Sequence, residues 1–160
     1  MSVSAPTSAP ALGSFTPEAF AAALATQTTA PAWWLDRKRA AYEKFASLLL
    51  PKRTDEMWRF SSYGALTLDG FEVGRVIPNA PSADSPFGPA SLTFINNTAT
   101  ATIAAPATLP VGVIITTLAA AAAKHPDLLR AHFMAQPQKL GSEKFAALHT
   151  AFVGDGAFIY

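Results

Sequence analysis

The chain has no cysteine among its 160 residues, and only 14% of its residues are charged. Without cysteine it can form neither disulfides, thiolate nucleophiles nor cysteine-held metal clusters. Its formal net charge is +1. So small a charge gives no general attraction to polyanions, so the composition predicts neither nucleic-acid nor acidic-lipid binding. With few charges to cover the surface, we expect some apolar surface to meet a protein partner.

Long hydrophobic runs and targeting signals are also missing. The longest apolar run, at 111–123, is too short to cross a membrane. The N-terminus has neither the basic start nor the apolar stretch of a secretory signal, and no basic residue precedes Arg37. We therefore expect a cytoplasmic protein with no membrane partner.

The chain offers little for catalysis or for cofactor binding. Gly154-Asp155-Gly156 does not have the spacing of a phosphate-binding loop. His125 and His132 would lie about 10 Å apart along a continuous helix, too far for one metal ion. His149 and Thr150 are adjacent, and adjacent helical residues do not face each other. We predict no catalytic residue, no metal site and no cofactor in this chain, and hence no enzyme.

The domain organisation is predicted from composition. Residues 1–13 are rich in Ser, Ala, Pro and Thr, which is typical of a disordered tail. Residues 14–160 are predicted to form one domain, with a helical part at 14–62 and a mixed strand and helix part at 63–160. Four prolines within 74–90 indicate a loop.

The helical part is expected to hold two main helices. Thr16-Pro17-Glu18 combines a capping hydroxyl, a proline and an acid, which favours a helix start. Pro31 and Pro51 are expected to bound a second helix. Its predicted inward stripe is Leu35, Tyr42, Phe45 and Leu49, with Arg37, Lys38, Arg39 and Lys44 outside it. Thr54 or Asp55 is expected to cap a short turn that follows.

The mixed part is expected to alternate strands and short helices. Strands are predicted at 65–73 and 111–115, and a hairpin joins 92–95 to 98–103 through Asn96-Asn97. Thr117 is expected to cap a helix at 118–124, and Pro126 to begin another. The predicted inward residues of that last helix are Leu128, Leu129, His132 and Phe133.

The last eighteen residues predict a helix that ends at a glycine and leads into a strand. Ser142 can cap the helix, and Phe145, Leu148 and Phe152 share one face. Residues 157–160 are apolar enough for a buried strand. No neighbour for this strand is evident, so we expect the chain to be the front part of a longer protein. An open strand edge also makes pairing with a second copy an expected form of self-association.

Aromatic and basic residues are mixed in the segment 33–60, which leaves a nucleic-acid hypothesis open. Such mixing is typical of single-strand binding. The segment has seven basic and four acidic side chains, however, a net of only +3. Aromatic residues at helical spacing are more often core residues, so a protein partner is the favoured interpretation and no nucleic acid is expected.

Three blocks of sequence occur in order over residues 31–160. They are PAWWL at 31–35 with the Asp55-Glu56-x-Trp58-Arg59 group, LPVGV at 109–113 with His125-Pro126, and KFAAL at 144–148 with DGxFIY at 155–160. Together they resemble the SufB/SufD family of iron–sulfur cluster assembly proteins, most closely the N-terminal domain of SufD. The Trp58-Arg59 pair favours SufD over SufB. One departure is His149, where the family usually has asparagine.

The resemblance implies a function and a set of residues. It implies an α+β domain of N-terminal helices, then a small antiparallel β unit with further helices, ending in the first strand of a β-helix. It also implies a non-catalytic scaffold role beside SufB-like and SufC-like subunits, with Fe–S clusters and ATP handled by other regions and subunits. The alternatives are a stand-alone protein-interaction adaptor or a single-stranded nucleic-acid-binding domain. The family-signature residues, expected to be structural, are Pro31, Trp34, Arg37, Phe45, Pro51, Glu56, Trp58, Arg59, Pro110, Gly112, Pro126, Phe145, Leu148, Phe152, Asp155 and Gly156.

Overall fold

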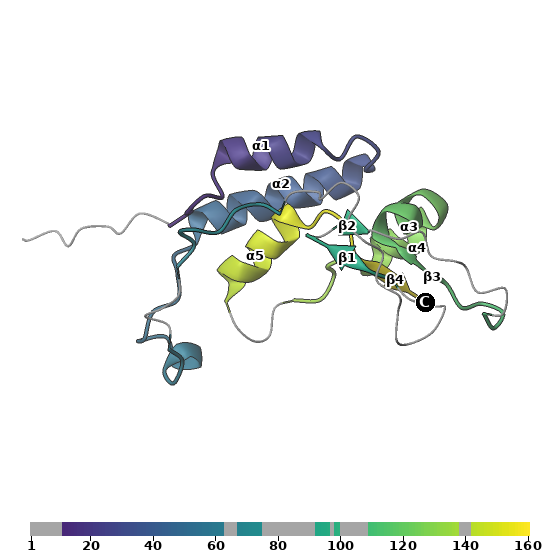
Figure 1. The fold of residues 1–160 in the computed structure, drawn as a ribbon. Coiled ribbons are helices and arrows are strands. Elements are labelled where there is room, and N and C mark those ends of the chain that lie inside the picture. Colours follow the sequence, from purple (N-terminus) through teal and green to yellow (C-terminus); the bar gives the residue numbers. More distant parts are fainter. Residues whose placement is uncertain (1–10, 63–66, 75–91, 97, 100–108, 138–141) are drawn as a thin grey trace, which may run out of the picture. The chain divides into compact units, whose positions relative to one another are not determined.

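The protein mixes helices with small antiparallel sheets. The structure, a computed structural model, describes residues 11–62, 67–74, 92–96, 98–99, 109–137 and 142–160 (Figure 1). These residues form five α-helices, one short 3₁₀ helix and four short strands. The predicted α+β class is therefore confirmed. Most of the predicted tail and of the predicted proline-rich loop lies outside the described residues, and the division at residue 62 stays a prediction.

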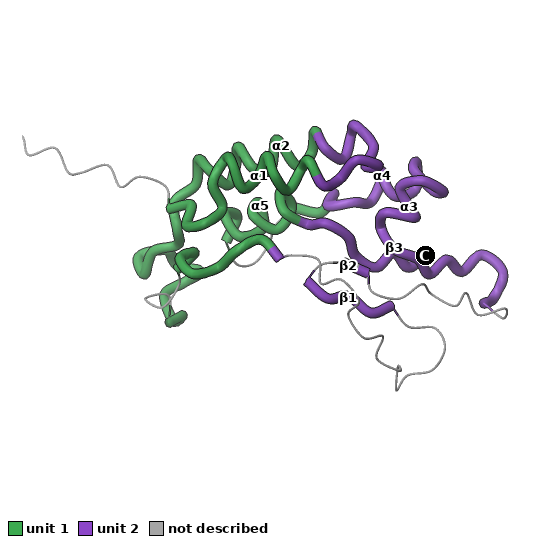
Figure 2. The backbone as a smooth tube through the Cα atoms, turned by 45° about the horizontal axis from the view of Figure 1, so that its top comes forward, with its two compact units in different colours: residues 1–25, 36–73, 136–152 green, residues 26–35, 74–135, 153–160 purple. Residues whose placement is uncertain are grey.

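The chain divides into two compact units, each made of three separate segments (Figure 2). Unit 1 comprises residues 1–25, 36–73 and 136–152. Unit 2 comprises residues 26–35, 74–135 and 153–160. Each unit has a hydrophobic core of its own.

Unit 1 is built on the helices α1 (Pro17–Ala25), α2 (Ala32–Ser47) and α5 (Glu143–Phe152). The predicted start of α1 is confirmed, because the Thr16 hydroxyl accepts a hydrogen bond from Ala19 N–H at 3.3 Å. In the core, the rings of Phe20 and Tyr42 stack with centroids 4.2 Å apart. The Tyr42 hydroxyl donates to the Phe15 carbonyl at 2.9 Å, so this buried polar atom is satisfied.

The inward face of α2 differs from the predicted stripe, since Trp34 is buried and Leu35 is only half-buried. Tyr42 and Phe45 are buried as predicted. Leu49 is 41% exposed, because the helix ends at Ser47 and later residues no longer follow its period. Lys38 was predicted to lie off the stripe but is fully buried. It falls one turn from both Trp34 and Tyr42, which places it on the same face as these buried rings.

The inward face of α5 consists of smaller side chains than predicted. Its start is confirmed, since the Ser142 hydroxyl accepts from Lys144 N–H at 3.2 Å. The buried residues are Lys144, Ala147 and Ala151. The predicted residues Phe145, Leu148 and Phe152 are half-buried beside this face and pack against the core of unit 1.

The strand predicted at 65–73 is absent from its described part, residues 67–73. A turn occurs there instead, with Gly70 at φ +81° and Asp69 N–H donating to the Thr67 hydroxyl at 2.9 Å. Leu68 is nevertheless buried in the core of unit 1. The apolar alternation correctly indicated burial, but the glycine turn prevents an extended strand.

Unit 2 contains two antiparallel strand pairs. The strands β1 (Phe94–Ile95) and β2 (Thr98–Ala99) form the predicted hairpin, with Phe94 opposite Ala99. Asn96 adopts φ +48° at the turn, as its residue type predicted. The remainder of the predicted second strand, at 100–103, lies outside the described residues.

The second pair joins β3 (Ile115–Thr117) to β4 (Ala157–Ile159). β3 begins later than predicted because a turn precedes it, with Gly112 at φ +90° and Val113 N–H donating to the Pro110 carbonyl at 3.1 Å. β4 was expected to have no neighbour, which is wrong, since β3 pairs with it in antiparallel register.

The helices α3 (Leu118–Lys124) and α4 (Pro126–His132) complete unit 2. Thr117 caps α3 as predicted, accepting from Ala120 N–H at 3.1 Å. The Trp34 ring stacks on Phe133 with centroids 4.3 Å apart, and Leu129 is also buried. His132 was predicted to face inward but is exposed at the end of α4.

No helix among the described residues has both the length and the apolar character that a membrane crossing requires.

Candidate functional site

A cleft of about 540 Å³ opens within unit 1. Its walls come from the segment after α2, from the 3₁₀ helix η1 (Glu56–Trp58) and from the start of α5. Three family-signature residues, Pro51, Glu56 and Trp58, lie in its lining. The full lining is Leu48, Leu49, Leu50, Pro51, Lys52, Asp55, Glu56, Met57, Trp58, Ser142, Glu143 and Lys144.

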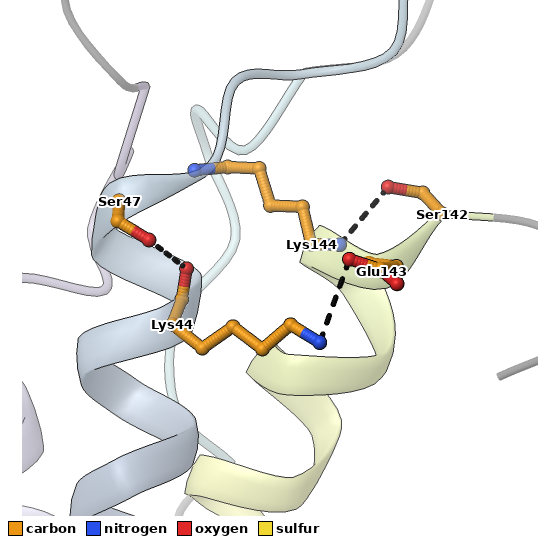
Figure 3. Close-up of polar contacts among 5 residues, drawn as sticks. All are labelled: Lys44, Ser47, Ser142, Glu143 and Lys144. Carbon is orange, nitrogen blue, oxygen red and sulfur yellow. Dashed lines mark hydrogen bonds and ion pairs between the residues drawn. The ribbon is translucent and has the colours of Figure 1, made fainter. Parts of the chain in front are cut away.

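Lys144 fixes one wall of this cleft to the other. Its side chain runs from the first turn of α5 to the end of α2 (Figure 3). The ammonium donates to the carbonyls of Phe45, at 3.0 Å, and Leu48, at 2.7 Å. The last carbonyls of a helix have no partner inside the helix, and the helix dipole makes that end negative. Lys144 therefore acts as a C-terminal cap of α2 that is supplied from almost a hundred residues away.

A second contact at the same junction is an exposed ion pair. The Lys44 ammonium lies 3.4 Å from the Glu143 carboxylate (Figure 3). More than half of each side chain is exposed, so solvent weakens this attraction. The Ser47 hydroxyl donates to the Lys44 carbonyl at 2.9 Å, which satisfies a further carbonyl at the end of α2.

The segment 52–60 forms the remaining wall and presents apolar side chains to solvent. Asp55, one of the two predicted caps, stands at the start of η1 but does not cap it with its side chain. Its carboxylate accepts from Lys52 N–H at 2.8 Å and closes the preceding turn. Arg59 lies 3.3 Å from the Glu56 carboxylate, and its guanidinium sits 4.5 Å from the centroid of the Phe60 ring. Phe60 is 90% exposed and Met57 61% exposed.

Two lysines of unit 1 are buried, and burial changes their pKa values. Burial lowers the pKa of Lys38 to about 8, and it also lowers the pKa of Lys144. Desolvation disfavours the charged form in both cases. For Lys144 the carbonyl oxygens and the face of the Phe45 ring, 4.3 Å from the ammonium, offset part of this cost.

In unit 2, Asp155 and Gly156 connect β4 to the start of α3. The Asp155 carboxylate accepts from Ala119 N–H at 3.0 Å and from Gly156 N–H at 2.8 Å. Leu118 N–H donates to the Gly156 carbonyl at 2.8 Å. A Cβ at position 156 would lie 2.9 Å from the end of the Leu118 side chain. Asp155 and Gly156 therefore hold the start of α3 next to β4.

Residues 85–160 match the family model described as the SufBD protein N-terminal region. Over these residues the match supports a SufB/SufD-family N-terminal region. The matched stretch contains β1, β2, β3, α3, α4, α5 and β4, and hence the Asp155-Gly156 junction and the Lys144 end of the cleft. The signature blocks at 31–59 lie outside the residues that the family model matches.

A curated relative supports the SufD side of this family. A stretch of 49 residues is 45% identical to the iron-sulfur cluster assembly protein SufD of Bacillus subtilis (strain 168). The stretch covers 31% of this chain and 11% of that relative. No solved structure matches the chain.

The other signature residues of the SufBD region lie in a turn, at a helix start or in packed positions. Pro110 and Gly112 form the turn before β3, and Pro126 begins α4. Phe145, Leu148 and Phe152 flank the buried face of α5.

Outside that region, the signature residues belong to three different environments. Trp34 is in the core of unit 2, and its indole N–H has no partner among the described residues. Phe45 is in the core of unit 1, while Pro31 and Arg37 are half-buried on or before α2. The structure thus collects only some of the signature residues at the cleft.

The described residues bring together no three histidine, aspartate or glutamate side chains that could hold a metal ion. The Thr150 hydroxyl donates to the Ala146 carbonyl of its own helix at 2.9 Å. His149, one residue earlier, is exposed. His125 lies parallel to the Phe158 ring, with centroids 6.5 Å apart, which is a packing arrangement.

Sequence reasoning missed the two buried lysines, since it placed Lys38 outside the inward stripe and gave Lys144 no role of its own. In each case the spacing from buried neighbours on the same helix indicated burial. Lys38 lies four residues from Trp34 and from Tyr42, and Lys144 lies three residues from Ala147 and seven from Ala151. These spacings place each lysine on a buried helical face.

Proposed function

We propose that this chain is the N-terminal domain of a SufD-like scaffold subunit of the Suf iron–sulfur cluster assembly complex. It acts by protein–protein contact rather than by catalysis. The observation that carries the proposal is the SufBD N-terminal region at 85–160, together with the 45% identity to a SufD protein over 49 residues.

The partners under this proposal are SufB-like and SufC-like subunits, in the cytoplasm. The chain has no cysteine, so it cannot supply the thiolates that usually hold iron–sulfur clusters. Clusters and ATP are then handled by other regions of the scaffold and by the other subunits, and this domain has no cofactor of its own.

Exposed apolar side chains beside the cleft support a contact role. Met57, Phe60 and Leu49 are large, and each is more than 40% exposed. A methionine fits irregular partner surfaces because its side chain is unbranched and flexible. Apolar side chains clustered in one exposed segment are typical of protein-interaction sites.

The single-strand nucleic-acid alternative loses part of its support. Trp34, Tyr42 and Phe45 are buried in the two cores, so these rings cannot stack on bases in the folded protein. The stand-alone adaptor alternative would use the same exposed residues without Suf partners.

The test is a binding titration of the 160-residue chain with purified SufB-like and SufC-like subunits of the same organism, followed by sedimentation velocity. We expect a complex with at least one subunit, weakened by Met57→Asp and retained by Val111→Asp. Val111 is the matched control because it is fully exposed but lies in unit 2.

Two results would overturn the proposal. One is a failure of the chain to bind either subunit. The other is stoichiometric iron and sulfide, or ATP hydrolysis, in the purified chain alone after anaerobic reconstitution.

A further inference from the structure

The lining of the cleft in unit 1 combines apolar side chains with carboxylates. Three of its residues are acidic, namely Asp55, Glu56 and Glu143, and all three are exposed. Half of its twelve residues are apolar: Leu48, Leu49, Leu50, Pro51, Met57 and Trp58. A partner that covers this cleft therefore has to supply both apolar contact and groups that suit carboxylates.

The basic residues of the lining do not balance these acids at the surface. Only Lys52 and Lys144 are basic, and Lys52 is exposed. Lys144 is 1% exposed, and its ammonium donates to the carbonyls of Phe45 and Leu48. Three exposed carboxylates in the lining therefore accompany one exposed ammonium group.

The carboxylates of Glu56 and Glu143 keep room for further donors. Each is paired with a cation from outside the lining, Arg59 at 3.3 Å and Lys44 at 3.4 Å (Figure 3 shows the second pair). Both distances exceed the roughly 2.7–2.9 Å of a strong charge-assisted hydrogen bond. A carboxylate has about four lone-pair sites, so one loosely held cation leaves most of them available. A donor from a partner can therefore bind without displacing Arg59 or Lys44.

We propose that this cleft binds a basic amphipathic helix of a partner protein. The apolar face of that helix lies against Leu49, Met57 and Trp58, and its lysine or arginine side chains reach the three carboxylates. This inference rests on the proposed function, because it names the partner chemistry for the same cleft.

The secondary structure of the cleft favours a helix over an extended segment as the occupant. An extended peptide usually binds by adding a strand to the edge of a sheet. None of the lining residues belongs to a strand, since they come from the end of α2 and the segment after it, from η1 and from the start of α5. A helix satisfies its own backbone groups and needs only side-chain contacts from such a surface.

The attraction for a basic segment is local to the cleft. The whole chain has a net charge of +1, so it does not attract basic peptides in general. An acidic segment in the cleft would meet three carboxylates with only Lys52 exposed to pair with it. Charge therefore selects a basic partner at this site, while the apolar contacts contribute most of the affinity.

The experiment is calorimetric titration of the 160-residue chain with two designed helical peptides of about 18 residues. Both carry the same stripe of leucines, and the other positions are lysine in one peptide and glutamate in the other. We expect the Leu/Lys peptide to bind about tenfold more tightly than the Leu/Glu peptide, as three weak exposed ion pairs allow. Met57→Ser removes an apolar contact without adding charge and should weaken binding of the Leu/Lys peptide.

Charge variants show whether the preference arises at the cleft. Asp55→Asn with Glu56→Lys should reverse the preference between the peptides, and asparagine keeps an acceptor for Lys52 N–H. Asp69→Asn with Glu72→Lys is the matched control, because it makes the same change in charge at exposed positions of unit 1 outside the lining. This control should retain the preference for the Leu/Lys peptide. Circular dichroism confirms that each variant is folded.

Several results would overturn the inference. They are a failure of the wild type to bind the Leu/Lys peptide, equal or tighter binding of the Leu/Glu peptide, and a preference that the cleft variant keeps or that the control also loses. The peptides contain no Suf sequence. A chain that prefers the Leu/Lys peptide but binds neither Suf subunit therefore contradicts the proposed function and not the basic-helix preference of the cleft.

Discussion

The lysines of unit 1 show that the same residue type can have opposite structural roles at one junction. Lys144 is buried and donates to two helix carbonyls, whereas Lys44 is exposed and pairs with a carboxylate. Burial makes the first contact hard to replace, because a buried carbonyl that loses its donor cannot turn to water. The second contact is screened by solvent.

Lys144→Met should therefore lower the free energy of unfolding by about 1–3 kcal/mol, as expected when buried acceptors lose their partner. Lys44→Met is the matched control and should cost about 1 kcal/mol or less. Urea unfolding at pH 7 measures both. Equal effects of the two substitutions would contradict the capping role of Lys144.

Lys38 should make stability depend on pH. Its pKa is lowered from 10.5 to about 8 in the folded protein, so between these values the unfolded chain binds more protons. Stability then rises as the pH increases from about 8 to about 10.5. We expect the wild type to gain stability relative to Lys38→Met over this window, measured by urea unfolding at pH 7, 9 and 10. A constant difference between the two proteins across the window would rule out this titration.

At the scale of elements, α3 depends on two side chains that accept from its first turn. Thr117 bonds to Ala120 N–H, and Asp155 reaches Ala119 N–H from the end of the chain. A seven-residue helix is too short to be stable alone, so its formation depends on such contacts and on packing.

Asp155→Ala should destabilise the protein by about 1 kcal/mol, the usual cost of losing a helix cap. Asp155→Asn keeps an acceptor oxygen and should lose less. Thermal unfolding of the three proteins at equal concentration gives the order. An unchanged melting temperature for Asp155→Ala would show that the carboxylate does not hold α3.

Sequence patterns whose effect stays within one helical turn could be interpreted correctly. Thr16, Thr117, Ser142 and Pro126 each marked a helix start, because a cap or a fixed φ acts on the next few residues. Contacts between residues that are distant in the sequence could not be predicted in this way. Nothing near β4 indicates that β3, some forty residues earlier, is its neighbour.

The candidate site was only partly predictable for the same reason. Pro51, Glu56 and Trp58 were singled out, and they lie together at the cleft. Lys144 was missed as its partner, because a lysine is normally assigned to the surface and its acceptors lie on another helix. Likewise, the length of α2 had to be known before Leu49 could be placed outside its stripe.

At the scale of the whole molecule, α2 belongs to both units. Residues up to 35 fall in unit 2, where Trp34 joins the core, and residues from 36 fall in unit 1, where Phe45 does. A destabilising substitution in the middle of this helix should therefore lower the stability of both units.

Ala40→Gly, at an exposed position of α2, should cost about 1 kcal/mol through helix propensity. We expect it to lower amide hydrogen-exchange protection in α5 and in α4, one in each unit. Ala123→Gly, at an exposed position of α3, is the matched control and should lower protection in unit 2 alone. Protection in α4 that is unaffected by Ala40→Gly would show that the units open independently.

The contact between Lys144 and Phe45 spans 99 residues of sequence. At a translation rate of about 5–20 residues per second, α2 is made roughly 5–20 s before the lysine that caps it. Its exposed carbonyls and the apolar rings of α1 and α2 stay uncovered by α5 during that interval. The order of synthesis thus differs from the order of assembly, and the growing chain must keep α1 and α2 from aggregating until α5 emerges.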